Sequence, residues 1–422
     1  MTGMGKGSIL AAAVILLLSI NAGELQGAAG PFPVQLSLEE CLNLAVENHP
    51  SLAEARASRA AQQAKLGQVK AGTALTGNVS ISAATQTGNG EGYSSGLTVT
   101  RLVYDSGKNG LERKSQKVSI DAASESERDA LLSVRTGVKG AYYSLLLKIL
   151  KRDQAESAVK TYEKHLQKAK GFYEIGTAAR FDVTKAEVDL SSARIDLVSA
   201  EAALDTAWAA LSNAVGVSLG KVRPTSPFLS HQVLPEEENA LSQALENRPD
   251  IRTARLRSVA GNLNVAIAAK GDAASVSLSG SANLSGSEFP LEDTFRVSAT
   301  LSVPAFDGGL TRFRVDEARS SAQALQAAMK KTEQTVLYEV RSSLLAAKEA
   351  EARIPVAGLL VRQAGENLSL AEGRYETGVG NALEVADALL AFNSAKVSHF
   401  QSLHDYSAAI AALERALGGE FR

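Results

Sequence analysis

The sequence contains an internal repeat, and this repeat restricts the folds that are open to the chain. The segment LAVENHPSLAEARA at residues 44–57 is similar to QALENRPDIRTARL at residues 243–256, and Pro50 aligns with Pro249 at an offset of 199. Self-similarity at a fixed spacing indicates a structural unit that is built twice. The 422 residues must therefore be divided between two copies of one arrangement.

The repeat extends over most of the sequence and defines the expected domains. LVYDSG at residues 102–107 aligns with PAFDGG at residues 304–309, where the offset is 202. We expect a first structural unit at residues 38–216 and a second at residues 240–418. A linker or equatorial segment at residues 217–239 connects them.

Each unit contains a stretch in which apolar and polar residues alternate. Strict alternation over about ten residues indicates β-strands that are apolar on one face only. We therefore expect one β-hairpin per unit, at about 75–104 and about 274–303, with TGNGEGYS and GSEFPLED as the loop tips. The alternation predicts one face that carries Val79, Ile81, Val297 and Leu301, and an opposite face that carries Ser80, Ser298 and Thr300.

Helical spacing dominates after each hairpin. Apolar residues from Val183 to Leu211 follow one another at intervals of three and four, which is the seam of a coiled coil. The segment from Gly107 to Phe172 predicts one helix of about 66 residues, or roughly 100 Å at 1.5 Å per residue. Pro355 falls inside the corresponding helix of the second unit, where it either bends the helix or is tolerated as a local irregularity.

The composition is that of a folded protein and gives no sign of nucleic-acid binding. Hydrophobic residues make up 45% and charged residues 21% of the chain, a balance that excludes a largely disordered protein. The formal net charge is -2. Because duplex binding usually needs a basic face, nucleic acid is not expected as a partner. Cys41 is the only cysteine, so no disulfide can form within the chain.

The N-terminal residues predict a secretory signal peptide at residues 1–29. Lys6 precedes an apolar run from Ile9 to Ile20, and the small residues GAAG follow, with a cleavage site near Ala29. The apolar run is about 12 residues long, whereas a membrane-spanning helix needs about 20. A signal peptide is therefore favoured over a membrane anchor, and the mature chain is expected outside the cytoplasm.

The four expected strands have the length of tilted membrane-spanning β-strands. Within lipid, an open four-stranded sheet would leave the backbone groups along its edges unpaired. The barrel must therefore be completed by other chains. Two, three or four copies would give eight, twelve or sixteen strands, and the strand pattern is compatible with all three assemblies.

No catalytic residue, metal site or cofactor site is expected. GYSSG at residues 92–96 matches the G-x-S-x-G nucleophile pattern, which needs a strand, a sharp turn and a helix, but it falls in an expected hairpin tip. His399 and His404 are five residues apart and do not share a helical face, and no His-Glu-x-x-His motif or cysteine cluster occurs. The sequence therefore does not predict an enzyme.

The motifs and their order resemble the TolC-like outer-membrane efflux proteins. The similarity covers nearly the whole mature chain: the opening SLEECLNLAVENHPSL, the junction VPAFDGG, the segments YEIGTAARFDV and YETGVGNALEV, and the twofold repeat itself. The resemblance implies a mainly α-helical fold with a transmembrane β part. In such a fold a long coiled-coil α-helical barrel adjoins a 12-stranded β-barrel, to which each chain of a homotrimer gives four strands.

The resemblance also implies a function and a set of partners. It implies a passive exit duct in the outer membrane, with a long periplasmic extension, in a tripartite efflux or type I secretion system. The implied partners are a periplasmic adaptor (membrane fusion) protein, an inner-membrane pump and outer-membrane lipid. The alternative is a periplasmic coiled-coil adaptor or scaffold. Such an adaptor would carry one helical hairpin in a soluble β-rich body, whereas this chain has amphipathic strands in two equivalent places.

Two carboxylates follow a glycine-bearing turn in the second unit. Glu384 and Asp387 lie three residues apart and share one helical face, where acids complement the helix dipole for about 0.3 to 1 kcal/mol. The resemblance implies that they form the aperture or gate, with six carboxylates around a threefold axis. Asp182 and Tyr375 match family residues that latch neighbouring helices in the closed state. Gly380 stands where the family pattern often has an arginine, so we expect a weaker latch.

The turns around Gly176 and Gly378 are the expected docking tips for the adaptor. They lie at the exposed ends of the long coiled coils and are expected to carry small, flexible residues rather than a bulky apolar patch. The gate and the docking site are therefore predicted to lie at the same end of the molecule.

Overall fold

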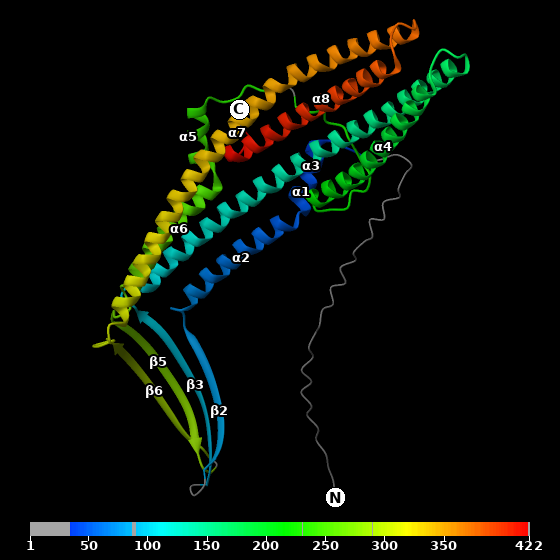
Figure 1. Cartoon of the computed structure of the whole chain (residues 1–422). Helices are drawn as coiled ribbons and strands as arrows, with labels where there is room; N and C mark the ends of the chain where they lie inside the picture. The colour runs from blue at the N-terminus through cyan, green and yellow to red at the C-terminus, as the bar shows by residue number, and fades with distance from the viewer. Residues whose placement is uncertain (1–33, 87–89, 230, 289, 421–422) are drawn as a thin grey trace, which may run out of the picture.

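Long helices at one end and a four-stranded sheet at the other give the molecule its elongated shape (Figure 1). The computed structural model describes residues 34–86, 90–229, 231–288 and 290–420. The predicted signal peptide lies outside the described residues. The expected fold class, mainly α with a β part and long helical hairpins, is confirmed.

The elements follow one another in the same order in the two halves of the chain. The first half contains β1 (Val34–Leu36), α1 (Leu38–Asn48), α2 (Pro50–Ala71), β2 (Thr76–Gln86), β3 (Gly90–Tyr104), α3 (Lys108–Glu174) and α4 (Arg180–Val215). The second half contains β4 (Val222–Pro224), α5 (Glu237–Asn247), α6 (Pro249–Ala268), β5 (Ser275–Gly286), β6 (Glu292–Ser302), α7 (Leu310–Glu376) and α8 (Ala382–Leu417). The helices α3 and α7 have 67 residues each, which corresponds to about 100 Å.

The seam of α4 that the sequence predicts is the buried side of that helix. Spacing of three and four keeps small and apolar side chains on one stripe of a helix, and α4 packs along α3 while α8 packs along α7. Each half therefore ends in a long helical hairpin. The buried residues of the α4 stripe are Ala186, Leu190, Ala193, Leu204, Ala207 and Leu211.

The four long strands form one antiparallel sheet in the order β2-β3-β5-β6. The hairpins meet through β3 and β5, so β2 and β6 are the edges. The prediction that GYSSG lies in a hairpin tip is wrong, because these residues lie within β3. The Oγ atoms of Ser94 and Ser82 are 2.7 Å apart across the ladder. Glycine does not interrupt backbone pairing, so the strand continues through this segment.

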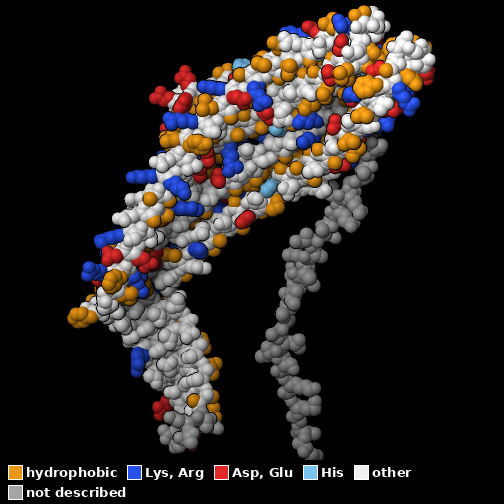
Figure 2. All heavy atoms as spheres, viewed as in Figure 1, with side chains coloured by type: hydrophobic (Ala, Val, Ile, Leu, Met, Phe, Trp, Pro, Cys, Tyr) orange, Lys and Arg blue, Asp and Glu red, His pale blue; other side chains and the backbone are white. Residues whose placement is uncertain are grey.

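The register places apolar and polar side chains on opposite faces of the sheet. Val79 pairs with Leu97, Leu97 with Ala282, and Ala282 with Phe295, and directly paired residues share a face. Apolar side chains gather along one side of the sheet in Figure 2. We call this side the apolar face; its exposed members include Val79 (69%), Ile81 (82%), Phe295 (77%), Val297 (87%) and Leu301 (66%).

In each half, the glycine that ends the last helix packs against the corner between the first two helices. Gly216 ends α4 with φ 84, and a Cβ at this position would lie 2.9 Å from Cα of His49 at the α1–α2 corner. Gly418 ends α8 with φ 82, and a Cβ there would lie 2.9 Å from the backbone nitrogen of Arg248 at the α5–α6 corner. Both the positive φ and the close approach require glycine. The repeat therefore preserves a packing contact.

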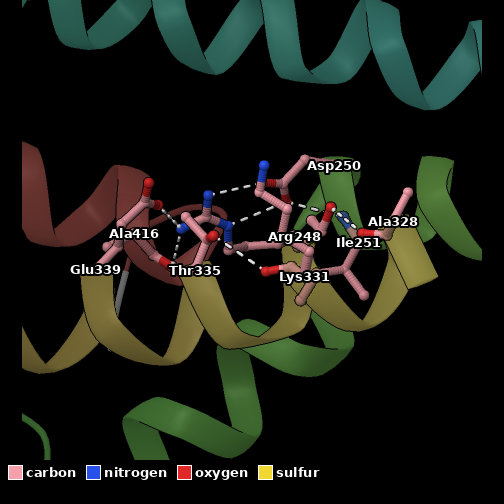
Figure 3. A network of polar contacts seen from close by, with 9 residues as sticks. Arg248, Asp250, Ile251, Ala328, Lys331, Thr335, Glu339 and Ala416 are labelled. Atoms are coloured by element: carbon pink, nitrogen blue, oxygen red, sulfur yellow. Dashed lines mark hydrogen bonds and ion pairs between the residues drawn. The ribbon is translucent and has the colours of Figure 1, made fainter.

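Arg248 is the centre of a polar network at the second corner (Figure 3). Its guanidinium forms a bidentate pair with Asp250, at 3.0 and 2.7 Å, and Nη1 donates to Glu339 at 2.7 Å. Nη1 also donates to the carbonyl oxygen of Ala416 at 3.3 Å. Because two carboxylates and a carbonyl surround this buried cation, the network can hold α6, α7 and the end of α8 together.

Hydroxyl groups of two buried tyrosines fix the segment between the two halves. The backbone N–H of Ser226 donates to Tyr142 at 2.7 Å, and that of Gln232 donates to Tyr406 at 2.8 Å. The short strands β1 and β4 pair in parallel beside it. The segment therefore packs against the long helices.

The long helix α7 continues through Pro355 without ending there. Among the described residues, none of the helices combines the length and the apolar character needed to cross a bilayer.

We predict that Val297→Arg reduces assembly in the outer membrane much more than Ser298→Arg. Val297 lies on the apolar face and Ser298 on the opposite face. The family resemblance places the apolar face in lipid, where a mid-bilayer arginine costs about 2 to 4 kcal/mol. The measurement is the fraction of each variant recovered as assembled protein from the outer-membrane fraction. Equal losses for the two variants would show that the faces are wrongly assigned.

Candidate functional site

Each long helical hairpin ends in a tight turn that contains a glycine. Gly176 lies between α3 and α4 with φ 77, and Gly378 lies between α7 and α8 with φ 73. In both turns the glycine N–H donates to a tyrosine carbonyl oxygen at 3.1 Å. A Cβ built on either glycine meets nothing within 4 Å. The backbone conformation therefore requires glycine here, while the space around both turns is open.

The tips expose larger apolar side chains than the sequence analysis expected. Ile175, directly before Gly176, is 70% exposed, and Val379, directly after Gly378, is 71% exposed. Phe181 and Leu383 follow at the starts of α4 and α8, with exposed fractions of 70% and 50%. The expectation of small residues alone was wrong, because a tight turn buries few of its side chains. The tips therefore expose apolar surface.

Glu384 lies in the first turn of α8 next to a basic side chain. The side chain of Asn381 caps this helix by accepting the N–H of Glu384 at 2.8 Å. The carboxylate of Glu384 is 3.3 Å from Nε of Arg374, in the last turn of α7. Both side chains are substantially exposed, so the pair contributes about 0 to 1 kcal/mol. Arg374 compensates part of the negative charge of Glu384.

Arg374 was not among the site residues predicted from the sequence. A Cβ at Gly380 would lie 3.0 Å from Cβ of Arg374 and 3.2 Å from Oε2 of Glu384. The missing side chain at position 380 therefore leaves room for the ion pair. A basic residue in the last turn of α7, facing an acid in the first turn of α8, is the sequence signal that would have indicated this contact.

Asp387, one turn farther along α8, borders a groove between the two hairpins. The groove has a volume of about 700 Å³ and is lined by residues of α3, α4 and α8. Gln154 donates to Asn393 at 2.9 Å beside it, and Lys185 pairs with Asp189. Asp387 is exposed and forms no hydrogen bond or ion pair with any residue that the structure describes. The two predicted gate carboxylates therefore have different surroundings.

Tyr375 lies between the two hairpins, with its ring against α3. Its ring centroid is 5.3 Å from that of Phe172 and 5.9 Å from that of His165. Its hydroxyl oxygen is buried and has no hydrogen-bond partner in the described part of the chain. Burial first, and then the negative charge of Asp182, raise the pKa of Tyr375.

The predicted latch residues are therefore neighbours without a direct bond. Asp182 accepts the backbone N–H of Ala179 at 3.1 Å and so closes the start of its own helix. An ion pair of 2.5 Å between Lys168 and Glu376 joins the same two hairpins. Aromatic packing and this ion pair, rather than an Asp182–Tyr375 hydrogen bond, connect the tips within one chain.

Side-chain contacts join the tips of the two hairpins. Within the described ranges, no group of three or more His, Cys, Asp or Glu side chains is placed to hold a metal ion. Near the tips, the contacts between the hairpins are the aromatic packing around Tyr375, the exposed Lys168–Glu376 ion pair and the hydrogen bond from Gln154 to Asn393. Farther from the tips, a second and more buried ion pair joins Lys139 to Glu414. The contacts near the tips can separate without breaking a buried core.

Comparison with known proteins relates the chain to efflux proteins. A protein-family model described as outer membrane efflux protein matches residues 41–217 and 240–419. The chain is 26% identical over 332 residues to the probable efflux pump outer membrane protein SepC of Pseudomonas putida, covering 76% of this chain and 69% of SepC. It is 32% identical over 183 residues to outer membrane protein OprJ of Pseudomonas aeruginosa, covering 42% of this chain and 38% of OprJ. The match to OprJ thus spans less than half of that protein.

The fold is similar to that of a solved outer-membrane channel. The CmeC outer membrane channel of Campylobacter jejuni superposes with a TM-score of 0.82 at 19% sequence identity, covering 90% of this chain and 85% of CmeC. The similarity at this identity concerns the arrangement of helices and strands.

His165 is a buried titratable side chain in the contact between the tips. This side chain is 8% exposed. Burial lowers its pKa below 6.5; Lys168 lowers the pKa further, and the carboxylates of Asp189, Glu372 and Asp182 raise it. A lowered pKa means that the unfolded tip binds the proton more readily than the packed tip does. Packing is therefore fully stable above the ordinary histidine pKa, and it weakens as the pH falls from that value to the lowered one, below which no further stability is lost.

We predict that acidification from about pH 7.5 to about pH 5 speeds amide hydrogen exchange at the tips. Exchange is measured by mass spectrometry in peptides covering residues 160–178 and 370–385, after correction for intrinsic rates. His165→Phe keeps a ring in the contact and should abolish this pH response, whereas the control His399→Phe should keep it. An undiminished response in His165→Phe would contradict the assignment.

Proposed function

The chain belongs to the outer membrane efflux protein family and is an outer-membrane duct for efflux, and we propose that it works as a passive trans-periplasmic channel gated at its tips. In this proposal the four-stranded sheet contributes to a barrel in the outer membrane. The long helices extend through the periplasm, and their tips regulate entry. The duct needs no chemistry of its own, because passage depends on the width and charge of the path.

One observation carries this proposal: an open sheet with an exposed apolar face continues directly into two helices of 67 residues. Among the described strands, β2 and β6 each pair on one side only. An unpaired backbone group costs several kcal/mol in lipid, so the sheet must be completed by other strands. Three copies would give a closed barrel of twelve strands, as the family resemblance implies.

Exposed apolar residues on the long helices support a homotrimer. Phe181, Val188 and Ile195 of α4 are seven residues apart and are 70%, 55% and 67% exposed. On α7, Tyr338 and Leu345 are likewise seven apart and are 73% and 66% exposed. Apolar side chains at a seven-residue spacing form a stripe that packs against another helix. Helices of neighbouring copies are the occupants that a closed helical barrel would supply.

We propose that Glu384 and Asp387 form the gate. In a trimer they would give six carboxylates near one axis, and rings of acidic side chains favour cations. The exposure of both residues and the unpaired state of Asp387 support this role. Arg374 belongs to the same proposed ring, because its ion pair with Glu384 reduces the net negative charge. Asp182 and Tyr375 are proposed to hold the hairpins in the closed state.

We propose that the tips around Gly176 and Gly378 dock a periplasmic adaptor, which links the duct to an inner-membrane pump. The open space around both glycines and the exposed side chains of Ile175 and Val379 support this role. An apolar tip at the end of a long helical hairpin is a suitable end-on contact surface, since adjacent charged residues can orient the partner.

Removing the two proposed gate carboxylates is predicted to lower cation selectivity. In planar bilayers, Glu384→Ala combined with Asp387→Ala should reduce cation selectivity severalfold and relieve block by divalent cations applied from the periplasmic side. Arg374→Ala should have the opposite effect, because it leaves Glu384 uncompensated. Asp182→Ala should raise conductance by loosening the closed state.

A matched control for the gate is Asp205→Ala, which removes one exposed carboxylate far from the tip of α4. This variant should leave selectivity and block unchanged. Unchanged selectivity and block in the double variant would instead limit Glu384 and Asp387 to stabilising the helix terminus.

Docking at the tips predicts a local effect of bulky side chains. Gly378→Trp should abolish export in cells while the protein still reaches the outer membrane, because the ring would cover the contact surface. Gly378→Ala is the control: it imposes the same backbone strain at φ 73 but leaves the space around the turn open, so it should retain more export than Gly378→Trp. Export that survives bulky substitutions at both Gly176 and Gly378 would rule out docking at the tips.

A further inference from the structure

A basic pocket lies where the sheet meets the long helices. It has a volume of about 540 Å³ and is lined by the end of β3, the start of α3, one residue of β5 and the loop after α2. Its charged side chains are Arg101, Arg113 and Asp105. In Figure 1 this junction lies at the end of the sheet opposite the hairpin loops.

The two arginines have unused hydrogen-bonding capacity. Nη2 of Arg113 donates to Oγ1 of Thr73 at 2.7 Å, but its Nε is buried and has no partner among the described residues. Arg101 is exposed and forms no hydrogen bond or ion pair in the described part of the chain. The carboxylate of Asp105 is already engaged, because its oxygens accept two backbone N–H groups at the start of α3, at 3.0 and 2.6 Å.

The second half of the chain shows that such a junction folds without these arginines. Asp307 aligns with Asp105 and caps α7 in the same way, with oxygens 2.9 and 2.7 Å from two backbone nitrogens. The positions 202 residues after the two arginines hold Val303 and Val315. The turn and the helix start therefore do not depend on arginine at these positions. The pair of arginines is specific to the first half.

The pocket opens onto the apolar face of the sheet. Arg101 pairs with Leu278, which shares that face. The ladder shifts after Leu102, so that Tyr104 pairs with Val276 and lies on the apolar face as well. Tyr104 and Leu278 are 54% and 46% exposed. Cationic and aromatic side chains at the end of an apolar band are typical of a membrane interface.

We propose that this pocket binds the phosphate of an anionic glycerophospholipid in the periplasm-facing leaflet, with the acyl chains lying on the apolar face. The proposal rests on the proposed function, because a membrane-spanning sheet places the pocket at the level of the headgroups. Guanidinium groups form strong, charge-assisted hydrogen bonds to phosphate. The excess positive charge of the pocket favours a headgroup without an ammonium group.

The test is binding of phosphatidylglycerol to the purified full-length protein in detergent, followed by native mass spectrometry. Arg101→Gln combined with Arg113→Gln should weaken binding about tenfold or more. Arg101→Gln alone should weaken binding severalfold; since Arg101 has no partner within the chain, its loss leaves the fold intact. Arg296→Gln is the matched control and should bind like the wild type, because Arg296 pairs with Ser281 on the opposite face.

Four outcomes would overturn the lipid site. Phosphatidylglycerol binding could be undiminished in the double variant. It could also be diminished in Arg296→Gln as much as in the double variant, which would indicate general charge attraction. Phosphatidylcholine could bind as tightly as phosphatidylglycerol. Alternatively, inorganic phosphate could displace the bound lipid as effectively as added phosphatidylglycerol does, which would indicate a site for a free anion.

Conductance in planar bilayers separates this inference from the proposed function. A double variant that conducts like the wild type but still binds phosphatidylglycerol undiminished would contradict the lipid site alone. A wild-type protein that fails to insert and conduct would contradict the proposed function itself.

Discussion

Backbone hydrogen bonding in the sheet is the constraint on which the rest of the structure depends. A chain with four antiparallel strands and two open edges cannot leave those edges unpaired in lipid. The exposed face of Val79, Ile81 and Val297 adds a second demand, because this apolar surface is uncovered in the single chain. Both demands are met when copies of the chain close a barrel. The proposed assembly would therefore complete a sheet that the single chain leaves open.

The long helices, like the sheet, expose apolar side chains that other copies of the chain could cover. Their seams are rich in alanine and leucine, so paired helices approach closely over great length, while a second stripe around Phe181 and Val188 stays exposed. The glycines at 216 and 418 and the Arg248 network fix the short helices against the long ones near the middle of the molecule. The tips lack such a clamp. The proposed gate, which needs movement, therefore lies away from these buried contacts.

The charged side chains at the tips differ from those beside the sheet. At the tips, Arg374 moderates an acidic site, and aromatic packing around Tyr375 joins the two hairpins. At the sheet, Arg101 and Arg113 form a basic pocket beside exposed apolar side chains. One end of the long helices therefore carries carboxylates at the proposed gate. The other end presents cations at the level proposed for lipid headgroups.

The sequence by itself determined the repeat, the four amphipathic strands, the long helices and the glycines of the turns, because each depends on local spacing or backbone conformation. Tertiary structure alone decided which side chains meet across a turn or between hairpins. Arg374 reaches Glu384, GYSSG joins a strand, and Tyr375 packs on Phe172 rather than bonding to Asp182. These contacts depend on three-dimensional distance between residues far apart in sequence or separated by a turn. Periodicity identifies the face that a residue occupies, but not the partner that the fold brings to it.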